Sequence, residues 1–128
     1  MIGAHKSGLV LLVEDDDSMR EAVQRLLECA GLQCVAFISA EQMLAQRKFQ
    51  DVTCVVSDLK LPGMSGLDLM GVLKAQGSCP PIIVITAHDA PGLREEAARR
   101  GATAYLAKPF RGTALLDVIT RCVQGESE

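Results

Sequence analysis

Short apolar runs and segments with helical periodicity alternate along the whole chain. Continuous apolar runs of about five residues, bounded by polar or turn residues, are typical of strands buried on both faces of a parallel sheet. We therefore expect strands at residues 9–13, 33–37, 53–57, 81–86 and 104–107. The segments between them place apolar residues three or four positions apart, as amphipathic helices do. The expected helices cover residues 18–30, 39–46, 66–75, 89–100 and 113–123.

Two patterns mark the starts of helices. Ser18-Met19-Arg20-Glu21 and Ser39-Ala40-Glu41-Gln42 each place a serine three residues before an acid or an amide. This spacing is that of a capping box, in which the two side chains satisfy the first free amides of a helix. Asp17 and Ser18 are therefore expected to cap the first helix, and Gly31 is expected to end it.

A strand followed by a helix, repeated five times, predicts an α/β fold. The strands form a parallel sheet, the crossovers are right-handed, and helices cover both faces of the sheet. A length of 128 residues favours a single domain. We expect this domain at residues 9–123, with an N-terminal extension at 1–8 and a tail at 124–128.

Composition narrows the class of protein. With 48% hydrophobic residues the chain can bury a sizeable core, and a net charge of −3 gives no basic footprint for nucleic acid. The apolar runs are too short to span a membrane, and the first eight residues lack the apolar stretch of a signal peptide. Five cysteines without a Cys-x-x-Cys pair favour reduced thiols in the cytoplasm over disulfides or zinc. We expect Arg94, Arg99 and Arg100 to lie on a solvated helix face, with a contact to a partner protein as the alternative.

Charged residues follow three of the expected strands. Glu14-Asp15-Asp16-Asp17 follows the first strand, Asp58 follows the third, and Lys108 follows the fifth. The carboxyl ends of parallel strands lie at one edge of the sheet, where binding sites form. Clustered carboxylates suit a hard divalent cation, and Asp58 is then placed to attack phosphorus.

Taken together, these motifs resemble the receiver domain of two-component response regulators. The resemblance covers residues 9–123 and implies a flavodoxin-like, doubly wound (βα)5 sandwich whose parallel strands have the order 2-1-3-4-5. It rests on the order and spacing of four features: the acidic pair after the first strand, Asp58 followed by Leu61-Pro62-Gly63-Met64-x-Gly66, Thr86-Ala87, and Lys108-Pro109-Phe110.

The resemblance implies a phosphoryl acceptor at Asp58 with a metal site beside it. Asp15 and Asp58 are expected to bind the metal directly, Glu14 through water, and Lys60 through its backbone carbonyl. The expected ion is Mg²⁺, for which Mn²⁺ or Ca²⁺ can substitute.

The run of acids leaves two choices for the acidic pair. The spacing to Arg20 favours Glu14 and Asp15, and glutamate then stands where the family more commonly has aspartate. A register shifted by one residue would make Asp15 and Asp16 the pair.

The resemblance also implies which residues respond to phosphorylation. Thr86 and Lys108 are expected to contact the phosphoryl oxygens, and Lys108-Pro109 to be a cis peptide. Tyr105 matches the family's aromatic switch position, with packing alone as the alternative. Movement of Thr86 and Tyr105 would reshape the surface of the fourth helix, fifth strand and fifth helix.

The implied function is a signalling phosphoacceptor that promotes its own phosphorylation and dephosphorylation, and not an enzyme. Asp58 would take a phosphoryl group from a phosphohistidine of a sensor histidine kinase or a histidine phosphotransfer protein. The switched surface would control an output, with transcription as the expected one, and phosphorylation could produce a homodimer. The domain itself is expected to contact neither nucleic acid nor membrane.

Three other functions fit the residues less well. A Mg²⁺-dependent phosphatase or phosphotransferase would be expected to carry an acid two residues after Asp58, where this chain has Lys60. A receiver used only as an interaction surface does not need the acids together with Thr86 and Lys108. Flavin binding is disfavoured by an aromatic content of 3% and by the lack of a phosphate-cradling loop.

Overall fold

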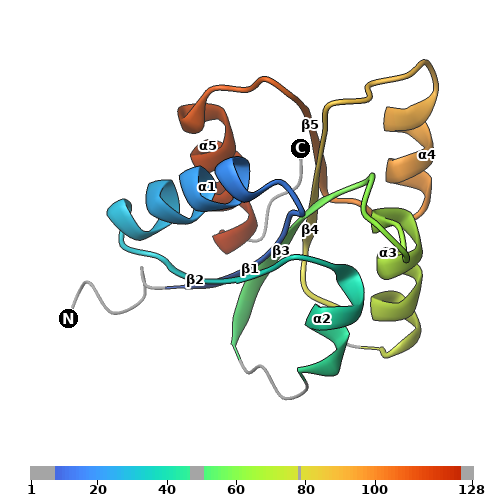
Figure 1. The fold of residues 1–128 in the computed structure, drawn as a ribbon, viewed down its shortest axis with the longest axis horizontal. Coiled ribbons are helices and arrows are strands. Elements are labelled where there is room, and N and C mark those ends of the chain that lie inside the picture. Colours follow the sequence, from blue (N-terminus) through green and yellow to red (C-terminus); the bar gives the residue numbers. More distant parts are fainter. Residues whose placement is uncertain (1–7, 47–50, 78, 125–128) are drawn as a thin grey trace.

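The computed structural model describes residues 8–46, 51–77 and 79–124. Five parallel strands form one sheet in the order β2-β1-β3-β4-β5, which confirms the predicted α/β fold (Figure 1). The strands are β1 (Leu9–Val13), β2 (Gln33–Phe37), β3 (Val52–Asp58), β4 (Ile82–Thr86) and β5 (Ala104–Ala107). The helices are α1 (Asp17–Cys29), α2 (Ala40–Ala45), α3 (Gly66–Ala75), α4 (Leu93–Arg99) and α5 (Gly112–Val123).

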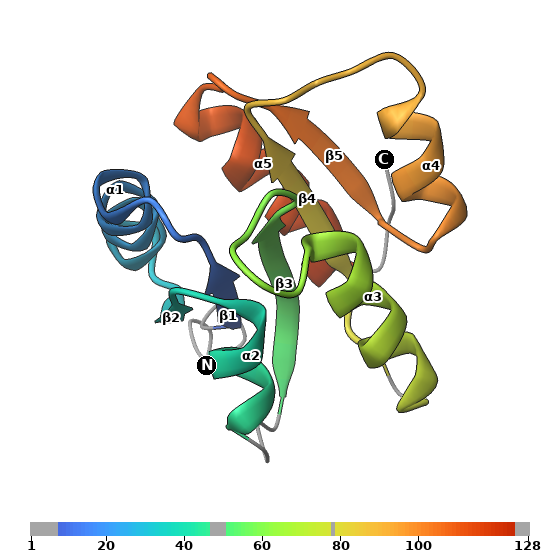
Figure 2. The ribbon, with the colours of Figure 1, turned by 45° about the vertical axis from the view of Figure 1, so that its right-hand side comes forward.

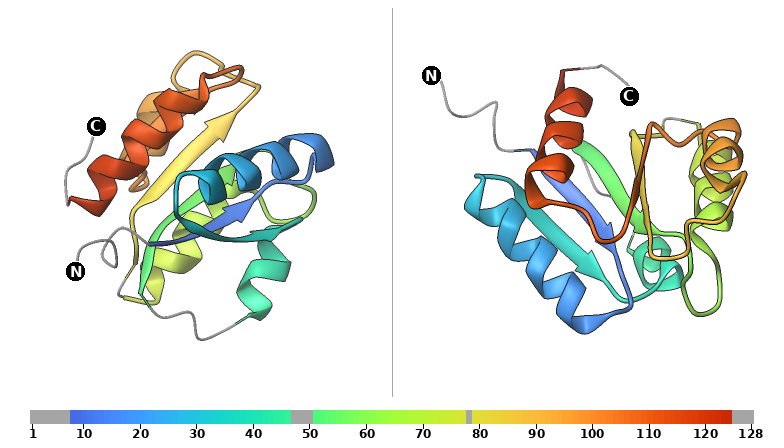
Figure 3. Two further views of the ribbon diagram at one scale, coloured as in Figure 1. Left: turned by 90° about the vertical axis from the view of Figure 1, so that its left-hand side faces the viewer. Right: turned by 90° about the horizontal axis from the view of Figure 1, so that it is seen from above.

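Different helices cover the two faces of the sheet because side chains alternate along each strand. Val10 and Leu12 of β1 pack with residues of α1 and α5, whereas Leu11 and Val13 pack with residues of α2, α3 and α4. Figure 3 shows α1 and α5 together on one side of the sheet. Every residue of β4 is buried, which explains its unbroken apolar sequence.

The first helix begins one residue earlier than expected, and its cap is Asp16 rather than Asp17 or Ser18. The Asp16 carboxylate accepts a hydrogen bond from the Met19 amide at 2.8 Å. Asp17 is the first helical residue, and its carboxylate pairs with Arg20 at 2.7 Å. The predicted capping box at Ser18 is therefore wrong. Neighbouring aspartates are chemically equivalent caps, so the length of the turn after β1 decides between them.

The second helix begins where the sequence predicts. Ser39 is its cap, and the Ser39 hydroxyl accepts a hydrogen bond from the Gln42 amide at 3.0 Å. The Gln42 side chain accepts from the amide of Ile38 at 2.9 Å, one residue before the cap. The second bond of the expected capping box therefore comes from the Ile38 amide and not from the Ser39 amide.

The fourth helix begins at Leu93 instead of at Asp89. Gly92 has a φ of 82°, in the left-handed region, and this conformation separates the helix from the preceding residues. Pro91 comes directly before it, and the backbone ahead of a proline is steered away from helical geometry. The predicted start at Asp89 was therefore wrong, and Asp89 lies in the loop after β4.

The core predicts unequal costs for truncating two adjacent leucines of α5. Leu115 is fully buried, whereas Leu116 is only partly buried. Leu115→Ala should lower the free energy of unfolding by about 2–5 kcal/mol, since it leaves a cavity against the sheet. Leu116→Ala, measured by the same denaturant titration, should cost clearly less. Equal losses would contradict this packing.

Candidate functional site

The carboxyl ends of four strands meet at one edge of the sheet. Asp58 is the last residue of β3 and Thr86 the last of β4, while Glu14 and Lys108 directly follow β1 and β5. Parallel pairing sets β1 against β3, β3 against β4, and β4 against β5. Residues that are up to 94 positions apart in the sequence are thereby brought within contact distance.

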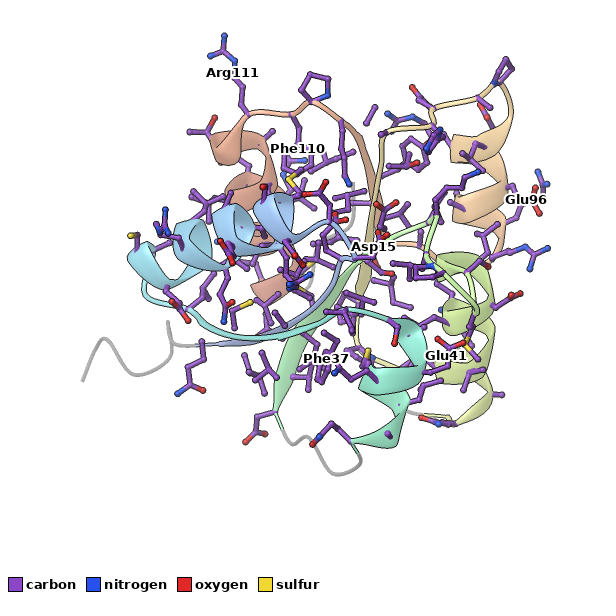
Figure 4. All side chains as sticks on the ribbon, viewed as in Figure 1. Asp15, Phe37, Glu41, Glu96, Phe110 and Arg111 are labelled. Atoms are coloured by element: carbon purple, nitrogen blue, oxygen red, sulfur yellow. The ribbon has the colours of Figure 1, made fainter. Side chains whose placement is uncertain are left out.

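Three acidic side chains converge at this edge. One carboxylate oxygen from each of Glu14, Asp15 and Asp58 lies within 4.8 Å of the other two. Glu14 and Asp58 are buried and Asp15 is exposed, and Figure 4 labels Asp15 where the chain leaves β1. Hard divalent cations bind clustered carboxylate oxygens, so this group can hold such an ion. The backbone carbonyl of Lys60, the fourth expected ligand, stays a prediction.

A single ammonium group joins two of these acids. Nζ of Lys108 lies 2.8 Å from Oε1 of Glu14 and 2.8 Å from Oδ2 of Asp58. The Lys108-Pro109 peptide is cis, as the resemblance implied. Two buried carboxylates therefore share one counterion, which offsets part of their mutual repulsion.

Burial and pairing act in opposite directions on the pKa values of this group. Burial raises the pKa of Glu14, and the hydrogen bond from Lys108 offsets this only in part, so the pKa lies above its ordinary value of 4.5. Burial alone would lower the pKa of Lys108. Hydrogen bonds to Asp58 and Glu14 outweigh that effect, and the pKa lies above 10.5. The Lys108 ammonium therefore stays charged at neutral pH.

Glu14 is held from several directions. Its Oε1 accepts from Lys108, and its Oε2 accepts from the Asp16 amide at 3.1 Å. Nη1 of Arg20 donates to the Glu14 backbone carbonyl at 3.0 Å. Asp16 caps α1 and does not belong to the three-acid cluster. Of the two registers left open by the sequence, the structure therefore brings Glu14 and Asp15 to Asp58.

Asp58 is fixed by the loop that follows it. Its Oδ1 accepts a hydrogen bond from the Lys60 amide at 3.1 Å, while its Oδ2 accepts from Lys108. The start of α3 packs against the Asp58 backbone at Gly66, where an added Cβ would lie 2.3 Å from the Asp58 carbonyl oxygen. Glycine is required at position 66 because the two segments approach so closely.

Thr86 lies beside the cluster on β4 and is fully buried. Its hydroxyl oxygen accepts from the His88 amide at 3.0 Å, and its backbone carbonyl accepts from the Lys108 amide at 2.7 Å. The hydroxyl is an acceptor in the first bond, so its own proton can be donated to another group. Thr86 thus links the end of β4 to the loop that follows it and to the loop after β5.

Comparison with known proteins decides the family. The sequence model of the response regulator receiver domain matches residues 10–120. The chain belongs to this family. The receiver domain is 42% identical over 122 residues to nodulation protein W of Bradyrhizobium diazoefficiens, and 37% identical over 110 residues to the transcriptional regulatory protein FixJ of Azorhizobium caulinodans. These matches cover 94% and 86% of this chain.

The relatives are longer proteins. This receiver domain spans 53% of the length of nodulation protein W and 52% of that of FixJ. Among solved structures, it is similar to response regulator StyR, with a TM-score of 0.85 and 38% identity, over 94% of this chain and 61% of that one. Within the described residues, the receiver domain has no helix that is long and apolar enough to cross a membrane.

Tyr105 of the receiver domain is held by side chains that the sequence did not predict. Its hydroxyl donates to Oδ1 of Asp89 at 2.8 Å, and the guanidinium of Arg94 lies 4.7 Å from the ring centroid. Arg94 also donates to the Tyr105 carbonyl at 3.4 Å. Arg94 is exposed, as expected of a solvated helix face, and it also contacts Tyr105 within the domain. We call these three residues the Tyr105 clamp.

Burial and the clamp together shift the pKa of the Tyr105 phenol. Burial, the hydrogen bond to Asp89 and the negative charge of Asp89 raise the pKa of Tyr105 from 10.0 to about 12, while Arg94 opposes the shift. The unfolded chain would release this proton at lower pH than the folded receiver domain does. The clamp therefore contributes stability that is complete below pH 10.0 and is lost as the pH rises toward about 12.

The clamp predicts the outcome of an absorbance titration. Tyr105 is the only tyrosine and the chain has no tryptophan, so phenolate absorbance reports this residue alone. In the folded domain the phenolate should form near pH 12. Asp89→Asn should move the midpoint down toward 10.0, because the carboxylate that disfavours ionisation is gone. A midpoint that does not move in this variant, with folding followed by circular dichroism, would contradict the clamp.

Proposed function

We propose that this receiver domain accepts a phosphoryl group on Asp58 from a phosphohistidine of a sensor histidine kinase or a histidine phosphotransfer protein. The observation that carries the proposal is the placement of the Asp58 carboxylate. It belongs to a cluster of three acids and lies 2.8 Å from the Lys108 ammonium. A nucleophilic oxygen is thus set beside a candidate cation site and a fixed positive charge.

The transfer exchanges one bond to phosphorus for another. A carboxylate oxygen of Asp58 forms the new P–O bond, the P–N bond to the donor imidazole breaks, and its electron pair stays on the imidazole nitrogen. The main obstacle is repulsion between two anions, about 3 kcal/mol for unit charges about 5 Å apart at an effective dielectric constant near 20. Asp15, Asp58 and the Lys60 carbonyl would hold a Mg²⁺ directly and Glu14 would hold it through water, and the ion would supply charge neutralisation between the reacting groups.

The chain's own residues complete the stabilisation of the product. Lys108 contacts the Asp58 carboxylate and, in the proposal, extends this contact to a phosphoryl oxygen. The Thr86 hydroxyl donates a hydrogen bond to another phosphoryl oxygen and draws the loop after β4 inward. That loop carries Asp89, so its movement acts on Tyr105 through the hydrogen bond between them. The surface of α4, β5 and α5 then changes shape.

The output proposed for this surface is transcription. The support is that FixJ, a relative 37% identical to this chain, is a transcriptional regulatory protein about twice as long as the matched region. In this proposal the domain works in the cytoplasm as a phosphoacceptor and not as an enzyme acting on other molecules. It forms homodimers through the switched surface and contacts neither nucleic acid nor membrane itself.

The phosphoacceptor role is tested with acetyl phosphate and Mg²⁺, followed by intact mass measurement. The native chain should gain one phosphate, whereas Asp58→Asn should gain none because its amide is not a nucleophile. Stoichiometric phosphate on the Asp58→Asn protein would rule out the assignment.

Thr86→Ala tests the switch separately from the chemistry. This variant keeps the nucleophile and should still be labelled by acetyl phosphate. Because it lacks the hydroxyl, amide chemical shifts in α4, β5 and α5 should change less on phosphorylation than in the native chain. Changes of equal size would show that Thr86 does not transmit the signal.

A further inference from the structure

A hydrogen bond connects the loop that carries Lys60, between β3 and α3, to the helix α2. Oε2 of Glu41, in the first turn of α2, accepts a hydrogen bond from the Met64 backbone amide at 2.8 Å. The two residues are 23 positions apart in the sequence. Figure 2 shows the loop between β3 and α3 beside α2, and Figure 4 labels Glu41 between α2 and α3.

Hydrogen bonds hold both ends of this loop, and between them Leu61 and Met64 pack against the hydrophobic core. The first part of the loop is held by the Lys60 amide on Asp58, and its end by the Gly66 amide, which donates to the Leu59 carbonyl at 2.9 Å. Between them, Pro62 has no amide hydrogen to donate. The bond from Met64 to Glu41 therefore adds a directional polar contact to the apolar packing of the stretch between the two end contacts.

Gly63 is adapted to the same contact. Its φ of 76° lies in the left-handed region that glycine favours. A Cβ added there would lie 2.5 Å from Oε2 of Glu41, so the carboxylate occupies the space that any other side chain would need. The carboxylate of Glu41 is thus packed against the peptide between Gly63 and Met64, which makes the contact short and directional.

We propose that Glu41 is a positioning residue for the phosphoacceptor site, a role that rests on the function proposed above. By accepting the hydrogen bond from the Met64 amide, Glu41 keeps the loop in one conformation. In that conformation the Lys60 carbonyl can bind the cation, and the Lys60 amide keeps its hydrogen bond to Asp58. Loss of this bond widens the set of loop conformations, and the affinity for Mg²⁺ falls because the loop must be ordered on binding.

A charge effect would give a different pattern from a positioning effect, and three substitutions separate them. Glu41→Gln keeps an oxygen acceptor of the same reach and removes the charge. Glu41→Asp keeps the charge, including its favourable place in the first turn of α2, and shortens the reach. Glu41→Ala removes both. Glu95→Ala, at an exposed acid in the first turn of α4, controls for general loss of surface charge.

Two measurements on the intact chain report the result. The first is the Mg²⁺ dissociation constant, from the amide shifts of Asp58 and Lys60 in a titration by NMR. The second is the hydrogen-exchange protection of the Met64 amide without metal. Glu41→Ala and Glu41→Asp should each weaken Mg²⁺ binding about three- to tenfold and lower the Met64 protection about tenfold, as expected for the loss of one hydrogen bond. Glu41→Gln and Glu95→Ala should stay close to the native chain.

The pattern across the variants decides the inference. If Glu41→Gln behaves like Glu41→Ala while Glu41→Asp behaves like the native chain, charge is responsible and the positioning role is overturned. Native values for all variants overturn it as well. Because the native chain is labelled with acetyl phosphate in parallel, failure of the proposed function would show as an unlabelled native chain. Failure of the Glu41 role would leave that labelling intact.

Discussion

The contact of Lys108 with both Glu14 and Asp58 is the interaction on which the site depends. Two carboxylates this close, both largely removed from water, would repel each other strongly without a counterion. The ammonium lies 2.8 Å from an oxygen of each, and its pKa is raised by these bonds, so it remains charged at neutral pH. Asp15 is exposed and adds negative charge that the ammonium does not balance. The edge of the sheet therefore keeps an excess of negative charge that favours a divalent cation.

This charge balance is a consequence of topology. The three residues belong to the ends of β1, β3 and β5, and no local segment of the chain contains more than one of them. Right-handed crossovers bring all strands into the sheet in the same direction, so their carboxyl ends share one edge. Burial of the central strands fixes their register, because a shift by one residue would turn apolar side chains to the wrong face. The packing of the core thus determines the distances at the site.

The sequence was sufficient for the strands and for the residues that meet at the edge. The apolar runs predicted β1, β2 and β5 at their observed bounds, because a buried strand is visible in the sequence as a run of apolar residues. Asp58 and Lys108 were found because each follows such a run, whereas Thr86 was implied by the resemblance to the receiver family. Asp16 as the cap of α1 was missed, because a run of aspartates offers equivalent caps and the tertiary structure chooses among them.

Contacts between distant polar side chains were beyond prediction. Neither the bond from Tyr105 to Asp89 nor that from Met64 to Glu41 follows from any periodicity. The first joins β5 to the loop after β4 and the second joins the loop after β3 to α2, and the approach of these segments depends on the whole fold. The contact of Arg94 with Tyr105 was not predicted, since helical position alone does not reveal an aromatic ring on the neighbouring strand. The start of α4 was misplaced for a local reason, the left-handed conformation of Gly92. These polar contacts connect the edge of the sheet to the surrounding loops.

The most direct test of the account is a map of where Mg²⁺ binds on the native chain. Backbone amide shifts followed through a titration should saturate, and the changes should be confined to the ends of β1 and β3, the turn after each, and the residues around Lys108. That result would show that the three acids and their counterion form one cation site. Shifts that never saturate, or that centre on exposed acids of α4 such as Glu95, would contradict it.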